Sequence, residues 1–102
     1  MPFMIETWDR PDAAAVRAKT RPAHIAYLEA NLDKLLAAGA KLADDGETAL
    51  GTLYIVTTDD RNEAQRFVAE DPFTKAGVPG QIVVTRWRKA IFDSKSFIPK
   101  AS

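Results

Sequence analysis

The segment GTLYIVTT at residues 51–58, followed by DDRNEAQRFVAEDP at residues 59–72, decides the fold. The first run is rich in β-branched and aromatic side chains, which is typical of a strand. In the second run, the D-x-x-E pattern that begins at Asp60 resembles a capping box, and Pro72 disfavours helical geometry in the residue before it. The two runs therefore predict a strand followed by a helix that ends near Asp71.

The N-terminal half predicts another strand and another helix. Residues 3–8, FMIETW, have strand composition and end at a turn-like DRP sequence. After a small alanine-rich stretch at 12–19, the TRP sequence at 20–22 resembles a helix start, because Thr20 can cap and a proline in the first turn loses no needed N–H. We expect this helix to end at Gly39. Its apolar stripe has helical spacing and comprises Ile25, Leu28, Leu32, Leu35 and Leu36.

The remaining segments complete a β-α-β-β-α-β order. A weak strand at 40–43 and a DDGE turn at 44–47 precede the strand at 51–58. A loop at 77–80 and a last strand at 81–88 follow the second helix. This order predicts the α+β, ferredoxin-like βαββαβ fold with a four-stranded antiparallel sheet.

Two helices can cover only one face of that sheet. The residues of the strand at 51–58 and of the last strand are apolar on both sides, since side chains alternate between the faces of a sheet. An uncovered apolar face requires a partner, and for a chain this short a second copy is the economical one. We therefore predict a homodimer. The alternating pairs are Leu53 and Ile55 against Tyr54 and Val56, and Ile82 and Val84 against Val83 and Trp87.

Length, charge and cysteine content narrow the class of protein. The 102 residues suffice for one domain, and the 14 basic and 14 acidic residues cancel, which argues against nucleic acid as a partner. No cysteine is present, so a disulfide framework is excluded and the cytoplasm is the expected location. The N-terminal residues lack the pattern of a signal peptide or membrane span, so we expect no membrane partner.

Several mechanisms lack the residues they need. All three serines lie at or after Ser94 and there is no cysteine, so a Ser or Cys nucleophile has no carrier. One histidine cannot build a two-histidine metal site, and the acidic residues of 44–47 are better explained as a solvated turn. Gly77 and Gly80 form neither GxGxxG nor a P-loop. We therefore expect no metal, nucleotide or other cofactor.

Two polar residues occupy unusual places. Asp71 falls on the helix face that should be buried, and a buried carboxylate needs a partner. His24, the only histidine, falls at the edge of the apolar stripe of the first helix. Asp71 before Pro72 is also a common local turn former, and His24 can be a hydrogen-bonded boundary residue. A functional His–Asp pair and two separate structural roles both fit these residues.

Two motifs resemble the YCII-related (YciI-like) family. They are RPAH at 21–24, which opens the leucine-striped helix, and AEDPFTKAG at 69–77, and they occur in the family's order before the closing strand. The resemblance covers about residues 3–92, so we assign a YCII-like domain to 1–92 and a C-terminal tail to 93–102. It implies a dimeric α/β barrel similar in fold to muconolactone isomerase, with His24 and Asp71 in the active site. The motifs add Arg21 and Phe73 as weaker substrate-binding candidates.

The resemblance also marks a departure and leaves the reaction open. Residues 44–48 replace a Gly-Pro-like segment that forms one pocket wall in the family. A His–Asp pair without metal, nucleophile or cofactor suits proton abstraction from an acidic carbon, so the first hypothesis is a lyase or isomerase acting on a small cyclic or aromatic acid. The alternative is a non-catalytic ligand-binding or interaction dimer. A third is a cofactor-free oxygenase, which Trp8 or Tyr54 in the pocket would favour.

Overall fold

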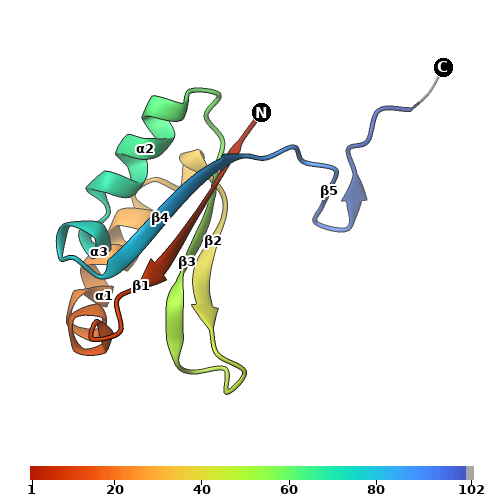
Figure 1. Cartoon of the computed structure of the whole chain (residues 1–102). Coiled ribbons are helices and arrows are strands. Elements are labelled where there is room, and N and C mark those ends of the chain that lie inside the picture. Colours follow the sequence, from red (N-terminus) through yellow and green to blue (C-terminus); the bar gives the residue numbers. More distant parts are fainter. Residues whose placement is uncertain (101–102) are drawn as a thin grey trace.

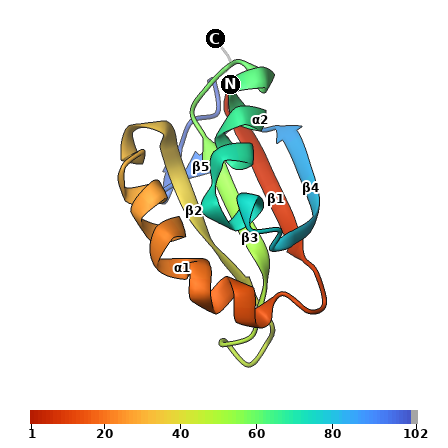
Figure 2. The ribbon, with the colours of Figure 1, turned by 90° about the vertical axis from the view of Figure 1, so that its left-hand side faces the viewer.

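The computed structural model describes residues 1–100 and shows a four-stranded antiparallel sheet with strand order β2-β3-β1-β4. The helices all lie on one face of this sheet (Figures 1 and 2). The predicted ferredoxin-like order is confirmed. Its elements are β1 (Phe3–Asp9), α1 (Ala14–Glu29), η1 (Leu32–Lys34), β2 (Leu35–Leu42), β3 (Ala49–Val56), α2 (Arg61–Glu70), α3 (Pro72–Lys75) and β4 (Pro79–Arg86).

The predicted bounds of the first helix are wrong. α1 begins at Ala14 and contains Pro22 in its interior, so neither Thr20 nor Pro22 marks its start. The alanine-rich stretch has the highest intrinsic helix propensity in this part of the chain, and the helix uses it although an internal proline removes one backbone hydrogen bond. His24 therefore lies well inside the helix and not in its first turn.

The leucines at 35 and 36 belong to β2, and this strand is longer than predicted. Leu35 pairs with Val56 and Gly39 with Leu53, so Gly39 lies within a strand and does not stop a helix. Helical spacing of leucines is a weaker constraint than the hydrogen bonds and side-chain contacts that a neighbouring strand offers. The gain of pairing with β3 determines this segment.

The other boundaries differ by small shifts. β3 and β4 each begin and end two residues earlier than predicted. α2 has the predicted bounds within a residue, and its N-cap Asp60 accepts a hydrogen bond from the Asn62 backbone N–H at 2.9 Å. The short helix α3 occupies residues that the DPF motif had identified only as a turn.

The core lies between the sheet and α2. It comprises alternate residues of β1 and β3 and one face of α2, in keeping with the periods of 2.0 and 3.6 residues for strands and helices. Burial of such a side chain contributes about 1.5–3 kcal/mol, so this layer holds the site residues in place. The cluster comprises Phe3, Ile5, Tyr54, Val56, Ala64, Phe67 and Val68.

The chain after β4 leaves the domain on the side of the sheet opposite the helices (Figure 1). It contains the hairpin of β5 (Ile91–Phe92) and β6 (Lys95–Ser96). The predicted tail 93–102 thus begins inside this hairpin, and its last two residues, 101–102, lie outside the described part of the chain. Within residues 1–100 no helix combines the length and hydropathy needed to cross a membrane.

Candidate active site

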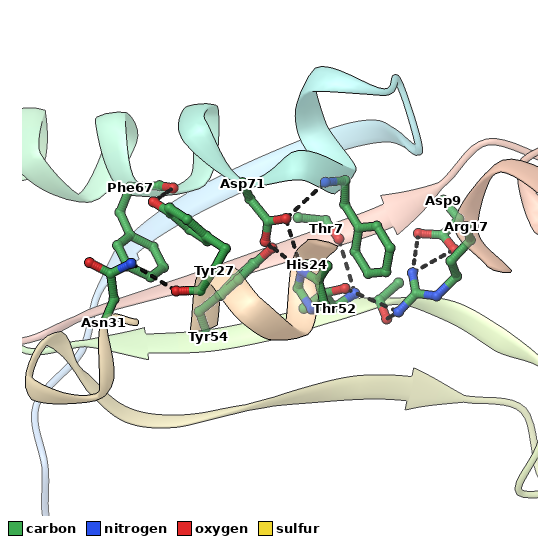
Figure 3. Close-up of polar contacts among 12 residues, drawn as sticks. Thr7, Asp9, Arg17, His24, Tyr27, Asn31, Thr52, Tyr54, Phe67 and Asp71 are labelled. Carbon is green, nitrogen blue, oxygen red and sulfur yellow. Dashed lines mark hydrogen bonds and ion pairs between the residues drawn. The ribbon is translucent and has the colours of Figure 1, made fainter. Parts of the chain in front are cut away.

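A buried histidine–carboxylate contact joins α1 to the segment between α2 and α3. Nδ1 of His24 lies 2.8 Å from each carboxylate oxygen of Asp71. His24 is 5% exposed and Asp71 is fully buried. Figure 3 shows the two side chains pointing toward each other above the sheet. The contact that the pairing hypothesis requires is therefore present, and Nε2 remains as the ring nitrogen that is not bonded to Asp71.

Asp71 also has the local role that its sequence neighbours indicate. It caps α3, and its Oδ1 accepts a hydrogen bond from the backbone N–H of Phe73 at 2.8 Å. Pro72 as the first residue of α3 keeps Asp71 extended, with φ −61° and ψ 131°, and this ends α2. The structural and the pairing interpretations of Asp71 hold together, since one carboxylate serves both.

An aromatic ring fixes the plane of the imidazole. The Phe73 ring is stacked on His24, with 3.9 Å between the centroids and 13° between the planes. Phe73 is itself buried. With Asp71 on Nδ1 and Phe73 against its face, the imidazole has little freedom to turn.

Tyr54 is a site residue whose contact with Asp71 the sequence did not reveal. Its hydroxyl donates a hydrogen bond of 2.5 Å to Oδ2 of Asp71, and the side chain is 1% exposed. Burial and the neighbouring carboxylate of Asp71 raise the pKa of Tyr54 above its ordinary value. The signal was available in principle, because a tyrosine on the buried face of a strand needs a hydrogen-bond partner for its hydroxyl.

A second buried ion pair lies one helical turn and more from His24 along α1. Arg17 donates two hydrogen bonds to the carboxylate of Asp9, at 3.0 and 2.8 Å. Its other nitrogen donates to the Gly51 carbonyl oxygen and to Oγ1 of Thr52, both at 3.3 Å. The guanidinium also lies 4.6 Å from the centre of the Phe73 ring. Sequence reasoning missed this pair, which holds α1 against β1 and β3 (Figure 3).

A pocket of about 920 Å³ opens in front of His24. Its volume exceeds the roughly 300 Å³ that a small-molecule ligand requires. The wall opposite α1 includes residues 46–48, so the segment that departs from the family pattern does contribute to the pocket. Neither Trp8 nor Tyr54 lines it. Charged and aromatic lining residues are Asp9, Arg10, Arg17, Arg21, His24, Glu47 and Phe73.

The predicted substrate-binding residues lie at this pocket in different settings. Arg21 is exposed at its rim, one turn before His24 on the same face of α1. Phe73 contributes to the lining but is largely covered by His24 and Arg17, so it supports the imidazole more than it meets solvent. Among the residues that the structure describes, no group of three or more His, Asp or Glu side chains is placed to hold a metal ion.

The fold and the site define a class of protein: a ferredoxin-like α+β domain with a buried His–Asp pair at the floor of a small-molecule pocket. The YCII-related domain matches residues 1–88, and the chain belongs to this family. Among curated proteins, none matches this sequence.

Two solved structures are similar to the chain. 5-Chloro-2-hydroxyhydroquinone dehydrochlorinase, TftG, from Burkholderia phenoliruptrix AC1100, in complex with 2,5-dihydroxybenzoquinone, is 36% identical with a TM-score of 0.79. The match covers 86% of this chain and 94% of TftG. At3g17210 from Arabidopsis thaliana is 8% identical with a TM-score of 0.44, over 85% of this chain and 92% of that one, and it contributes nothing to the functional argument.

Proposed function

We propose that the protein is a cofactor-independent lyase or isomerase that acts on a small, acidic, cyclic substrate. The observation that carries this proposal is the His24–Asp71 contact of 2.8 Å at a pocket of about 920 Å³. The similarity to a dehydrochlorinase over most of both chains supports an elimination reaction in particular.

His24 serves as the general base in this proposal. The Asp71 carboxylate accepts the Nδ1 proton, which favours the tautomer with a free electron pair on Nε2. Nε2 takes a proton from an acidic O–H or C–H of the substrate, and the electron pair left behind moves into the ring and expels a leaving group such as chloride. The imidazolium that forms is stabilised by Asp71, and the reaction needs no oxidant or reductant.

The charges around the pocket suit an anionic substrate. Arg17 is neutralised by Asp9, whereas Arg10 and Arg21 are exposed at the rim with Glu47 as the acidic lining residue. A ring that carries ionised hydroxyl or carboxylate groups would gain charge-assisted hydrogen bonds from these guanidinium groups. Arg21 is the better placed of the two relative to His24, because three residues separate them on one helix face.

Two compounds test this function. We expect 2,5-dihydroxybenzoquinone to bind to the wild-type protein in calorimetry, and incubation with 5-chloro-2-hydroxyhydroquinone to release chloride faster than buffer does. Binding without turnover would favour the non-catalytic ligand-binding dimer. Absence of both would remove support for this substrate class. The oxygenase hypothesis loses its motivation, since Trp8 and Tyr54 are not among the lining residues.

We further propose that the protein functions as a homodimer joined through the face of the sheet that the helices leave uncovered. Cross-strand partners share a face, and the register places apolar residues of all four strands there. An apolar surface of this extent is typical of an interaction site. These residues are Met4 and Trp8 on β1, Ala37 on β2, Leu53 and Ile55 on β3, and Val83 on β4.

A further inference from the structure

Both oxygens of the Asp71 carboxylate already accept a hydrogen bond from a group other than the histidine. Oδ1 accepts from the Phe73 backbone N–H at 2.8 Å, and Oδ2 accepts from the Tyr54 hydroxyl at 2.5 Å. Nδ1 of His24 lies within 2.8 Å of both oxygens. The carboxylate is therefore surrounded by three polar groups in a site without exposure to water.

This arrangement determines the direction of the hydrogen bond to the histidine. A backbone N–H can only donate, and an ionised carboxylate can only accept. If Asp71 carried a proton and donated it to Nδ1, one of its oxygens would have to give up its present role as acceptor. The fully satisfied alternative is an ionised Asp71 that accepts from Nδ1–H, with Nε2 unprotonated in the neutral ring.

We propose that Tyr54 is a positioning residue whose hydroxyl bond to Asp71 keeps the Nδ1–H tautomer of His24 and so keeps Nε2 available as the base. The Phe73 N–H belongs to the backbone and is present in any variant, so Tyr54 supplies the donor that evolution or mutagenesis can change. Tyr54 does not line the pocket and has no contact with substrate in this arrangement.

The surroundings favour Tyr54 as a permanent donor. Burial and Asp71 hold its pKa above the ordinary value for tyrosine, Tyr27 acts in the same direction, and Arg17 acts in the opposite one. The phenol therefore stays protonated throughout the neutral range. A donor of this kind, placed on an ionised acceptor, forms one of the stronger hydrogen bonds in proteins.

The test uses the tautomer of the single histidine, which gives unambiguous ring nitrogen signals in ¹⁵N NMR. At a pH where the ring is neutral, we expect protonated Nδ1 and unprotonated Nε2 in the wild-type protein. In Tyr54→Phe, we expect the fraction of the Nε2–H tautomer to rise several-fold and the affinity for 2,5-dihydroxybenzoquinone to fall by about tenfold with a changed pH profile. Tyr27→Phe is the matched control, because the Tyr27 hydroxyl donates to the Phe67 carbonyl oxygen at 2.7 Å and not to Asp71.

Two results would overturn the inference: a wild-type Nε2–H tautomer, or a folded Tyr54→Phe variant whose tautomer and pH profile match those of Tyr27→Phe. The wild-type spectrum decides the matter if Tyr54→Phe does not fold. The inference depends on the proposed function only for its effect on catalysis. If the wild-type protein bound no quinone, the proposed function would lose support while the tautomer measurement still tested Tyr54.

Discussion

Nδ1 of His24 lies 2.8 Å from the carboxylate of Asp71, although 47 residues separate them in the chain. The contact depends on two separate features of the fold. α1 places His24 on the face directed at the α2–α3 junction, and the Asp-Pro sequence ends α2 so that Asp71 turns inward. The pair is thus built from elements that the core already fixes, which is what a preorganised general base requires.

Replacement of His24 by Asn should abolish turnover and quinone binding while the protein keeps its fold. The asparagine amide can donate to Asp71, so we expect the free energy of unfolding to change by less than about 1 kcal/mol. Chemical denaturation and calorimetric titration measure the two effects. A loss of about 1–3 kcal/mol with unaltered ligand binding would instead assign His24 a structural role.

Replacement of Asp71 by Asn should be more costly, because this carboxylate receives donors from three directions and caps α3. An amide has only one acceptor oxygen, so a buried donor loses its partner, and we expect a loss of about 2–3 kcal/mol. Asp60→Asn, at the exposed N-cap of α2, is the control, since asparagine caps a helix about as well as aspartate. Equal stability of the two variants would contradict the central role of Asp71.

The sequence was sufficient for the topology and for the His–Asp pair, for different reasons. Strand β3, the cap at Asp60 and the end of α2 before Pro72 follow local rules that the tertiary structure does not override. His24 and Asp71 came from unusual positions in the pattern and from the two family motifs. Their contact distance was not predictable, since it depends on how α1 packs against α3.

The remaining features are decided by contacts between distant segments. Leu35 and Leu36 fit a helical stripe, yet the edge of β3 offers hydrogen bonds that a helix extended to Gly39 would leave unused. The Arg17–Asp9 pair and the Tyr54–Asp71 bond each join residues that no spacing rule relates. Side-chain contacts of this kind become visible only when the packing of the elements is known.

Alkaline pH should destabilise the protein through its buried tyrosines. Burial, together with the charges of Glu70 and Asp71, raises the pKa of Tyr27 from 10.0 to about 12. A raised folded-state pKa means that stability is fully present below about pH 10 and declines as the pH rises toward 12, because the unfolded chain loses its proton first. Denaturant midpoints between pH 8 and 12 measure this decline. Tyr27→Phe should make it shallower, and an identical slope in that variant would refute the assignment.

Chelators and nucleotides should leave the thermal stability unchanged. Among the described residues no side-chain cluster is suited to a metal ion, and the chain has no phosphate-binding glycine motif. A ligand of the native state at a hundredfold excess over Kd would stabilise it by about 2.7 kcal/mol, which is easily detected in a melting curve. A shift of the melting temperature with zinc, flavin, NAD or EDTA would therefore contradict a cofactor-independent mechanism, whereas 2,5-dihydroxybenzoquinone should raise it.

Two neighbouring residues of β4 test the homodimer. Val83 and Ile82 are similarly exposed, at 38% and 37%, but they point to opposite faces of the sheet. Val83 pairs with Glu6 on the uncovered face, and Ile82 pairs with Thr7 on the helix side. Val83→Lys would place a charge in the proposed interface, where desolvation without a partner is costly. We expect it to dissociate the dimer, whereas Ile82→Lys should remain dimeric.

Sedimentation at micromolar concentration distinguishes these outcomes. The wild-type chain and Ile82→Lys should sediment as dimers, and Val83→Lys as a folded monomer or as an aggregate. A monomeric wild-type chain would end the dimer proposal. A variant at Tyr54 is unsuitable for this purpose, because that side chain faces the helices and Asp71, so a charge there would disrupt the core and not the interface. Since the pocket is lined by α1 and by residues 46–48 of one chain, Ile82→Lys should also keep its affinity for 2,5-dihydroxybenzoquinone.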